Sequence, residues 1–240
     1  MSDDSEIVVE GHWAVEALIA SGRFEIRLVL VESGRHPDLV EVLEKGKIPH
    51  SILSAEELRS VAGYDFHRGV MAHVVRPHPS GPTVDFLVKA RRLVAPVRLA
   101  DPGNVGTIIR TAVAFGADGI LIEKGKGADP WGRKSIRASA RAIFRVPIFE
   151  VENLEETLLE AGKHHFSIFG TSLSEEASPL REVKPVKKSI ILFGAEKEGL
   201  SGSLHKLCDQ LIGIPMANEM DSLNVAASAA IVCHDLFVPR

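Results

Sequence analysis

Three segments in the second half of the sequence combine glycines with polar side chains that could hold a substrate or a cofactor. They are residues 101–116 with Asn104 and Arg110, residues 191–201 with Gly194 and Glu196, and residues 214–230 with Ser222 and Asn224. Each segment begins at or near the end of a predicted strand. Glycine at such a position lets a ligand approach the backbone closely. The three segments are therefore candidates for ligand binding.

Each segment also has an ordinary structural interpretation, which the residues alone leave open. Asn104 is placed to cap a helix with an apolar face, on which Arg110 is simply exposed. Gly194 can belong to a strand-to-helix turn, and Ser222 can cap a terminal helix rich in alanine. None of the segments matches the glycine-rich dinucleotide pattern or the Walker A pattern, so neither kind of nucleotide site is predicted.

The strands that precede these segments predict an α/β fold. Five apolar runs are predicted as strands, at residues 93–100, 119–123, 165–170, 189–194 and 210–216. Helical stretches follow the first, second and fourth, and a helix at residues 153–162 precedes the third. Continuous apolar strands between helices are typical of a mostly parallel sheet covered on both faces. Ligands bind such sheets at the carboxyl ends of the strands, which is where the polar segments lie.

The first part of the chain has its own alternation of elements. Helices are predicted at residues 11–22, 37–46 and 54–63, and strands at residues 26–32, 50–54 and 69–75. Residues 76–85 then hold three prolines and a glycine, which can extend neither a helix nor a central strand. We therefore predict a small α/β domain over residues 1–77, a linker over residues 78–88 and a larger domain over residues 89–240.

The composition limits the class of protein. A chain of 240 residues that is 45% hydrophobic and 25% charged can bury a sizeable core and is not expected to be disordered. No apolar run reaches the length of a membrane span, and the acidic N-terminus lacks the features of a signal peptide. Cys208 and Cys233 alone cannot build a disulfide framework or a four-thiolate metal site, and no metal is predicted. We expect a cytoplasmic protein that does not bind membranes.

A net charge of −4 excludes an overall basic surface but allows a local basic patch. No acidic residue occurs between Asp129 and Glu150, where the basic residues are Arg133, Lys134, Arg137, Arg141 and Arg145. Arginines that recur every four positions would form a stripe on a helix and could neutralise the phosphates of a nucleic acid. A solvated helix face is the alternative. His67 and Arg68 are further candidates, with a polar bend before a strand as their alternative.

Taken together, in this order and spacing, the three segments resemble the signature motifs of the SpoU (TrmH) family of RNA ribose 2′-O-methyltransferases in the SPOUT superfamily. The matching patterns are DPGN-x-G-x-x-x-R, F-G-A-E-x-x-G-L and I-P-M…S-L-N-V-A, and the resemblance covers about residues 89–240. It implies a domain whose C-terminal part forms a deep trefoil knot, a rare exception among protein folds. The N-terminal unit resembles the small, ribosomal-protein-like substrate-binding domain of many members, through its topology, its length and F-H-R-G-V-M-A at residues 66–72.

The resemblance implies methyl transfer from S-adenosylmethionine to a ribose 2′-hydroxyl of structured RNA, more often rRNA than tRNA, by a homodimer joined through the knot region. The implied catalytic positions are Arg110, Asn104, Glu196, Ser222 and Asn224. The implied cofactor positions are Gly194, Ile214, Met216 and Leu223, and the RNA contacts would be Arg133, Arg137, Arg141, His67 and Arg68. Arg110 would either activate the hydroxyl or stabilise the developing alkoxide while binding the adjacent phosphate.

Two further readings compete with this one. The first is a non-catalytic RNA-binding or assembly protein that retains the knotted fold, which the presence of all five implied catalytic residues disfavours. The second is methylation of a base, which the S-L-N step and the arginine of the first motif disfavour. The chain also departs from the family pattern R-A-S-x-G-A, in which many members have glycine where this sequence has Arg141.

Overall fold

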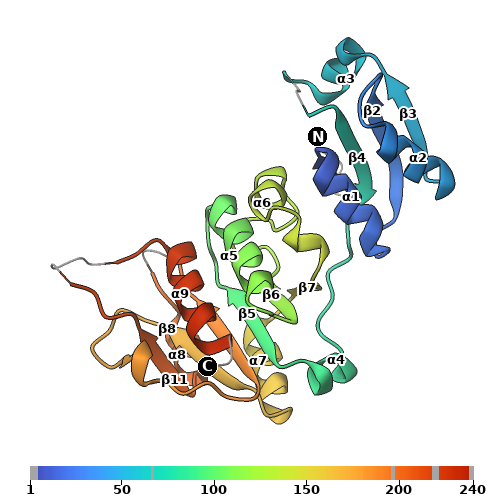
Figure 1. The fold of residues 1–240 in the computed structure, drawn as a ribbon. Coiled ribbons are helices and arrows are strands. Elements are labelled where there is room, and N and C mark those ends of the chain that lie inside the picture. The colour runs from blue at the N-terminus through green and yellow to red at the C-terminus, as the bar shows by residue number, and fades with distance from the viewer. Residues whose placement is uncertain (1–4, 66–67, 196–197, 218–221, 238–240) are drawn as a thin grey trace.

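The chain folds around two β-sheets, each flanked by helices (Figure 1). The computed structural model describes residues 5–65, 68–195, 198–217 and 222–237. Within these ranges, no helix combines the length and the apolar character that crossing a bilayer requires. The smaller sheet belongs to the N-terminal part and the larger one to the C-terminal part, with residues 76–83 running between them outside any helix or strand.

The N-terminal part is a four-stranded mixed sheet with three helices. Its elements are β1 (Glu6–Glu10), α1 (His12–Ser21), β2 (Ile26–Glu32), α2 (Pro37–Lys45), β3 (His50–Leu53), α3 (Ala55–Ala62) and β4 (Val70–Val75). The strand order is β1-β4-β2-β3, with only β2 and β3 parallel. The predicted strands and helices of this part are confirmed to within two residues. Sequence analysis missed β1, which pairs with β4 at the edge of the sheet.

The C-terminal part is a seven-stranded sheet in which every pairing of neighbouring strands is parallel. Its order is β7-β6-β5-β10-β8-β11-β9. The elements are α4 (Val84–Lys89), β5 (Arg92–Pro96), α5 (Pro102–Ala114), β6 (Gly119–Glu123), α6 (Arg133–Ala138), the 3-10 turn η1 (Ala142–Phe144), β7 (Ile148–Val151), α7 (Leu154–Lys163), β8 (Ser167–Thr171), β9 (Ser178–Pro179), the 3-10 turn η2 (Leu180–Glu182), β10 (Ser189–Phe193), α8 (Gly202–Leu207), β11 (Gln210–Gly213) and α9 (Val225–Phe237).

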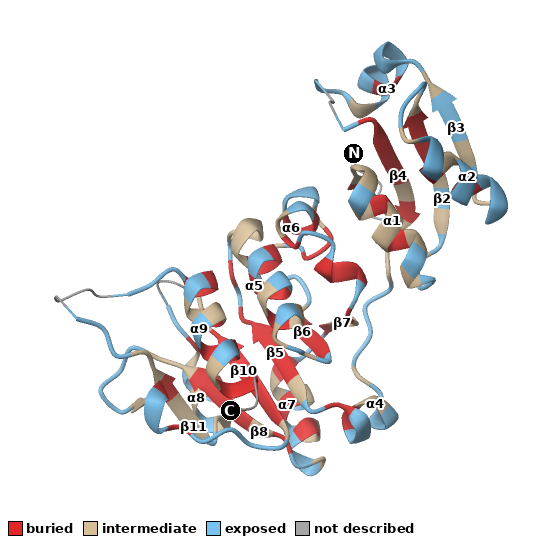
Figure 2. Cartoon of the chain, in the orientation of Figure 1, coloured by how far each residue is buried: buried red, intermediate tan, exposed pale blue. Residues whose placement is uncertain are grey.

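Helices cover both faces of the large sheet, as the apolar strands predict. On β10, Ile190 and Leu192 pack with residues of α4, α7 and α8, whereas Ile191 and Phe193 pack with residues of α5 and α9. Figure 2 shows the central strands buried and the outer sides of the helices exposed. The mostly parallel α/β sheet is therefore confirmed. Sequence analysis missed β7 at the sheet edge, and α4 begins within residues 78–88, where only a linker is predicted.

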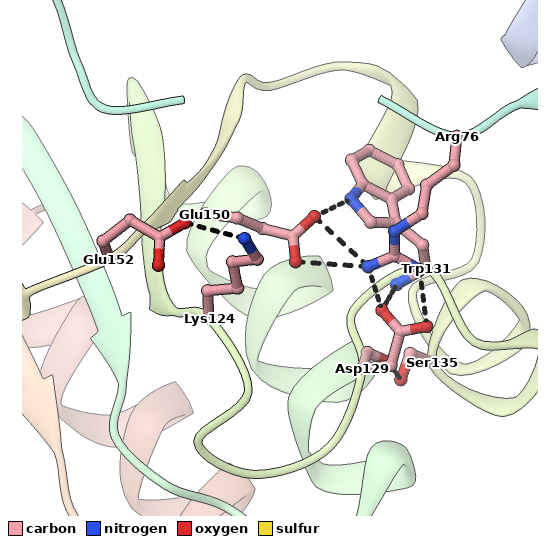
Figure 3. A network of polar contacts seen from close by, with 7 residues as sticks. All are labelled: Arg76, Lys124, Asp129, Trp131, Ser135, Glu150 and Glu152. Carbon is pink, nitrogen blue, oxygen red and sulfur yellow. Dashed lines mark hydrogen bonds and ion pairs between the residues drawn. The ribbon is translucent and has the colours of Figure 1, made fainter. Parts of the chain in front are cut away.

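A cluster of polar contacts around the buried Glu150 joins the end of β4 to the large sheet (Figure 3). The guanidinium of Arg76 donates to both oxygens of Asp129 at 2.9 Å and to Glu150 on β7 at 3.2–3.3 Å. The indole N–H of Trp131 donates to Glu150 at 2.9 Å. Glu150 is only 6% exposed, and burial raises the pKa of its carboxyl group. Arg76 and Trp131 together supply the donors that this buried carboxylate needs.

Two helices of the C-terminal part approach each other unusually closely at Gly106 of α5. A β-carbon at this position would lie 2.2 Å from the backbone oxygen of Ser135 and 2.7 Å from the β-carbon of Ala138. Both contacts are with α6, so the close partner predicted at Gly106 is a neighbouring helix of the same chain. Because backbone cannot be displaced as a flexible side chain can, glycine is required for this packing.

We expect Gly106→Ala to lower the free energy of unfolding by at least about 2 kcal/mol, since α6 must move away from α5. Chemical denaturation monitored by circular dichroism would measure the loss. Gly162→Ala in α7 is the matched control, because a β-carbon there meets no atom within 4 Å. The control should be stabilised by about 0.5–1 kcal/mol. Equal stability of the two variants would show that the α5–α6 contact is not tight.

Candidate functional site

The first candidate site is a pocket of about 330 Å³ at the carboxyl edge of the large sheet. Its walls come from the segments that follow β8, β10 and β11 and from the start of α9. Five of the predicted cofactor and catalytic positions line it: Gly194, Ile214, Met216, Ser222 and Leu223. Residues from separate parts of the sequence thus meet in one cavity, as expected where parallel strands end.

The wall at Gly194 is built from backbone. A β-carbon on Gly194 would lie 2.5 Å from the carbonyl carbon of Gly199 and 2.7 Å from the amide nitrogen of Leu200. Ala195 and Gly199 also exchange two backbone hydrogen bonds, of 2.8 and 3.2 Å, which hold the loop against the strand end. Any larger residue at position 194 would push the loop away. Apolar side chains complete the pocket, and Met216 and Leu223 are 36% and 38% exposed.

A hydrogen bond between two asparagines joins the start of α9 to α5 beside this pocket. The side-chain amide of Asn224 donates to Oδ1 of Asn104 at 3.1 Å. Oδ1 of Asn224 accepts from the backbone N–H of Ala226 at 2.9 Å. Asn224 therefore caps α9, and the prediction that Ser222 caps it is wrong. Ser222 lies two residues earlier and lines the pocket instead.

The prediction that Asn104 caps α5 is also wrong. Asp101 is the capping residue, since its carboxylate accepts a hydrogen bond from the backbone N–H of Gly103 at 2.9 Å and Pro102 begins the helix. Lys134 of α6 contacts the same carboxylate at 2.6 Å and lowers its pKa. Asn104 lies inside the first turn, and its side chain is thereby free of the capping role and bonds Asn224.

Three further predicted catalytic positions, Asn104, Arg110 and Asn224, do not line the pocket. Arg110 is exposed on α5, six residues beyond Asn104, a rise of about 9 Å along the helix. Within the described part of the chain, its guanidinium makes no hydrogen bond or ion pair with another residue. Glu196 falls outside the described residues, as does His67 of the predicted RNA contacts.

The second candidate site is a cleft of about 560 Å³ between the N-terminal part and α6. All four predicted RNA-contacting arginines that the structure describes line it: Arg68, Arg133, Arg137 and Arg141. The opposite wall comes from the junction of β1 and α1, which includes Glu10 and Trp13. Nε of Arg133 lies 2.7 Å from Glu10, so one of the four charges is paired. The two parts of the chain thus form a basic cleft together.

The prediction of one continuous helical stripe of arginines is wrong. α6 ends at Ala138, and the next residues turn sharply, with φ angles of 46° at Ala140 and 79° at Arg141. These left-handed conformations favour glycine, which explains why many members of the family named above have glycine at the position of Arg141. The turn nevertheless returns Arg141 to the cleft that Arg133 and Arg137 line.

Sequence reasoning missed contributors to both sites. Residues 171–174 line the pocket, and they form a polar segment after the buried strand β8, which is the same signal that revealed the other three segments. Trp13 lines the cleft, and 65% of this side chain is exposed. The apolar periodicity of the sequence does not reveal this exposed position, because α1 is apolar on most sides. Trp131, by contrast, is buried against Phe24 and serves packing.

Comparison with known proteins identifies relatives of both parts of the chain. Residues 91–234 match the model of the SpoU rRNA Methylase family, and residues 8–80 match the model described as RNA 2′-O ribose methyltransferase substrate binding. The chain is 33% identical over 205 residues to a 23S rRNA (guanosine-2′-O-)-methyltransferase, RlmB, of Acinetobacter baylyi, covering 82% of this chain and 81% of that protein. It is 28% identical to a putative TrmH family tRNA/rRNA methyltransferase of Staphylococcus saprophyticus, covering 98% and 96% of the two chains.

A solved structure agrees with these relatives. The SpoU methyltransferase AviRb from Streptomyces viridochromogenes, in complex with the cofactor AdoMet, superposes with a TM-score of 0.82 at 26% identity, covering 96% of this chain and 89% of that one. Fold, motifs and relatives together define an RNA 2′-O-methyltransferase that uses S-adenosylmethionine. The chain belongs to the SpoU rRNA Methylase family.

The pocket at the sheet edge has the properties that this cofactor needs. Its volume is near the lower end of the range, roughly 300–1,000 Å³, in which small-molecule sites fall. Backbone groups at Gly194 can supply hydrogen bonds, while Ile212, Ile214 and Leu223 supply apolar surface for a neutral adenine ring. The residues of this chain therefore fit S-adenosylmethionine.

The left-handed backbone at Arg141 gives a prediction about stability. Arg141→Gly should be more stable than Arg141→Ala by about 1 kcal/mol, because only glycine adopts positive φ without steric cost. Arg137 provides the opposite control, since it lies in the helix α6. There the glycine variant should be less stable than the alanine variant by about 0.5–1 kcal/mol. Thermal unfolding of the four variants measures both differences, and the same order at both positions would contradict the conformation at Arg141.

Proposed function

We propose that this protein methylates a ribose 2′-hydroxyl of structured RNA in the cytoplasm, and that its substrate is rRNA rather than tRNA. The observation that carries the proposal is the convergence of the second and third signature segments on one pocket with a backbone wall, to which the hydrogen bond from Asn224 to Asn104 joins the first segment. The choice of rRNA is supported by the Acinetobacter relative, whose name specifies 23S rRNA and whose similarity spans most of the chain. The comparisons give no support to the alternative of a non-catalytic RNA-binding protein.

In this proposal Gly194, Ile214, Met216 and Leu223 hold the cofactor. S-adenosylmethionine supplies a methyl group on a positively charged sulfur, the electrophile that the reaction requires. The hydrogen bond from Asn224 to Asn104 fixes the first turn of α5 against the mouth of the pocket, where Ser222 also lies. Asn104, Ser222, Asn224 and Glu196 would orient the ribose, and much of the rate enhancement would come from this alignment.

Arg110 acts on the substrate in this proposal as a fixed positive charge. A guanidinium stays protonated in proteins, so it is a poor general base. It can bind the phosphate next to the reacting ribose and stabilise the alkoxide that develops as the 2′-proton leaves. Its exposed position without a partner in the described part of the chain leaves its donors available for such a phosphate.

A homodimer joined near α9 is part of the proposal. Ile231 of α9 is 41% exposed, and it lies in a hollow with Phe115, Ile214 and Pro215. An apolar surface of this kind favours contact with a second copy of the chain. Because Arg110 does not line the pocket of its own chain, a site completed by residues of two subunits fits its position.

The trefoil knot is likewise proposed. Three features support it: β10 lies between β5 and β8 in the sheet, the segments after β10 and β11 line the same pocket, and α9 returns to pack on α5. The thin alanine-rich surface of α9, with Ala226 and Ala229 buried, suits the close packing of a knotted chain.

The RNA is proposed to lie along the basic cleft. Arg68, Arg137 and Arg141 can contact phosphates there, together with Arg133 and with His67 from outside the described residues. Such contacts predict affinity that falls steeply as the salt concentration rises. The fork of the guanidinium group suits phosphate better than the ammonium of lysine does.

Gly194→Ala should abolish binding of S-adenosylmethionine, because the added carbon overlaps the backbone of Gly199 and Leu200. Isothermal titration calorimetry measures the loss, which we expect to exceed about a hundredfold in affinity. Gly202→Ala is the control, since a β-carbon there meets no atom within 4 Å. Retained affinity in a folded Gly194→Ala protein would place the cofactor elsewhere.

Methyl transfer from labelled S-adenosylmethionine to RNA of cells that lack this protein tests the function itself. We expect label in a 2′-O-methylnucleoside from the rRNA fraction. Arg110→Ala should lose transfer by about a thousandfold, the loss that removal of one transition-state contact causes, yet bind the cofactor normally.

The result can contradict this proposal in three ways. Label in the tRNA fraction would change the substrate, and label on a base would change the reaction. Loss of cofactor binding in a folded Arg110→Ala protein would remove Arg110 from the role given to it here.

A further inference from the structure

Trp13 is an exposed aromatic side chain at the edge of the basic cleft, and the role of this residue is not explained by packing. Its exposed fraction is 65%, whereas Trp131 is 4% exposed. The guanidinium of Arg141, which lines the same cleft, lies over the Trp13 ring, 5.8 Å from its centre. A large aromatic surface left in water next to cations is typical of a stacking platform for a flat ligand.

The charges in the cleft define the rest of the ligand. Glu10 forms an ion pair with Arg133, whose guanidinium also lies 5.0 Å from the centre of the Tyr64 ring, so the charge of Arg133 is already balanced by a carboxylate. Arg68, Arg137 and Arg141 form no ion pair with a carboxylate in the described part of the chain. Three unpaired guanidinium groups around one cavity call for a ligand that carries negative charge.

The backbone at Arg141 also indicates a functional position. Ala140 and Arg141 are two successive residues other than glycine with positive φ, at 46° and 79°. Each such residue costs on the order of 1–3 kcal/mol, and strain of this kind concentrates at binding sites. This turn, which follows the end of α6, places the Arg141 guanidinium over the Trp13 ring.

We infer that the cleft binds one unpaired nucleotide of the substrate RNA, with its base stacked on Trp13 and its phosphates held by Arg68, Arg137 and Arg141. This inference rests on the proposed function and adds a second site of contact with the RNA, besides the ribose that is methylated. A cavity of about 560 Å³ is large enough for one nucleotide, and a base inside a duplex could not present its face to the ring. The ligand class is therefore single-stranded or bulged RNA.

The nucleotide held here is not the one that is methylated. α6 packs on one flank of α5, and α9 with the cofactor pocket lies on another (Figure 1). A helix with its side chains is about 10–12 Å thick, so the two sites are separated by at least that distance. The cleft would anchor the RNA at an unpaired position near the target ribose and so contribute to the choice of site.

Tryptophan fluorescence can test this inference, because the chain has two tryptophans and only Trp13 is exposed. The probes are a twelve-nucleotide single-stranded RNA, a duplex of the same length, and adenosine monophosphate. We expect the single strand to quench the emission of the full-length protein. The Trp13→Phe variant, whose remaining emission comes from Trp131, should show no quenching.

Affinity for the single strand provides the second measurement. Trp13→Ala should weaken binding about tenfold, the effect of losing one stacked base, while Trp13→Phe should stay within about threefold of the wild type. Arg141→Ala should weaken binding about as much as Trp13→Ala. The matched control is Arg59→Ala, an exposed arginine of α3 outside the cleft, which should change affinity less than about twofold.

Several outcomes would overturn the inference. Equal quenching by the duplex would indicate a phosphate-binding surface, and saturation by adenosine monophosphate at lower concentration than the single strand would indicate a site for a free nucleotide. Unchanged affinity in Trp13→Ala would remove the stacking contact. If the protein transfers methyl groups but the single strand does not quench the Trp13 emission, the cleft is not the nucleotide site and the proposed function still holds. Quenching without transfer would refute the function and leave the cleft as an RNA-binding site.

Discussion

The buried carboxylate of Glu150 is the group on which the relation between the two parts of the chain depends. A carboxylate with so little exposure is costly unless it is paired, and burial already raises its pKa. Its donors are Arg76, which directly follows β4, and Trp131, which precedes α6. Satisfying one charge therefore fixes the end of the small sheet, the edge strand of the large sheet and the start of α6 together. α6 also forms one wall of the basic cleft, so the position of that wall depends on this contact.

Much of the fold could be predicted because most strands are short apolar runs bounded by polar or glycine-rich segments. The runs at residues 189–193 and 119–123 are apolar at nearly every position, as a strand covered on both faces must be. Two of the missed strands, β1 and β7, combine glutamate with apolar residues and lie at sheet edges, where one side of the strand needs no partner. Their signal in the sequence is therefore weak.

More of the candidate pocket than of the cleft could be predicted from the sequence. Its residues follow separate strands, and parallel strands bring their carboxyl ends to one edge whatever the details of packing. The cap of α5 was misassigned because aspartate and asparagine both cap helices and both occur near Pro102. The capping residue is Asp101, which directly precedes this proline. The cleft depends on a left-handed turn at Arg141 and on the orientation of two sheets, neither of which the spacing of arginines reveals.

The position of β10 in the large sheet has a consequence for the order in which the molecule can be assembled. β10 lies between β5 and β8, and Ser189 pairs with Arg92 on one side and with Ser167 on the other. During synthesis both older strands leave the ribosome with this edge unpaired, and unpaired edges invite aggregation. The central strand must then enter between them, a non-local step of the kind that slows folding. Because α9 follows still later and its first turns line the pocket at the sheet edge, that pocket is incomplete until α9 has been made.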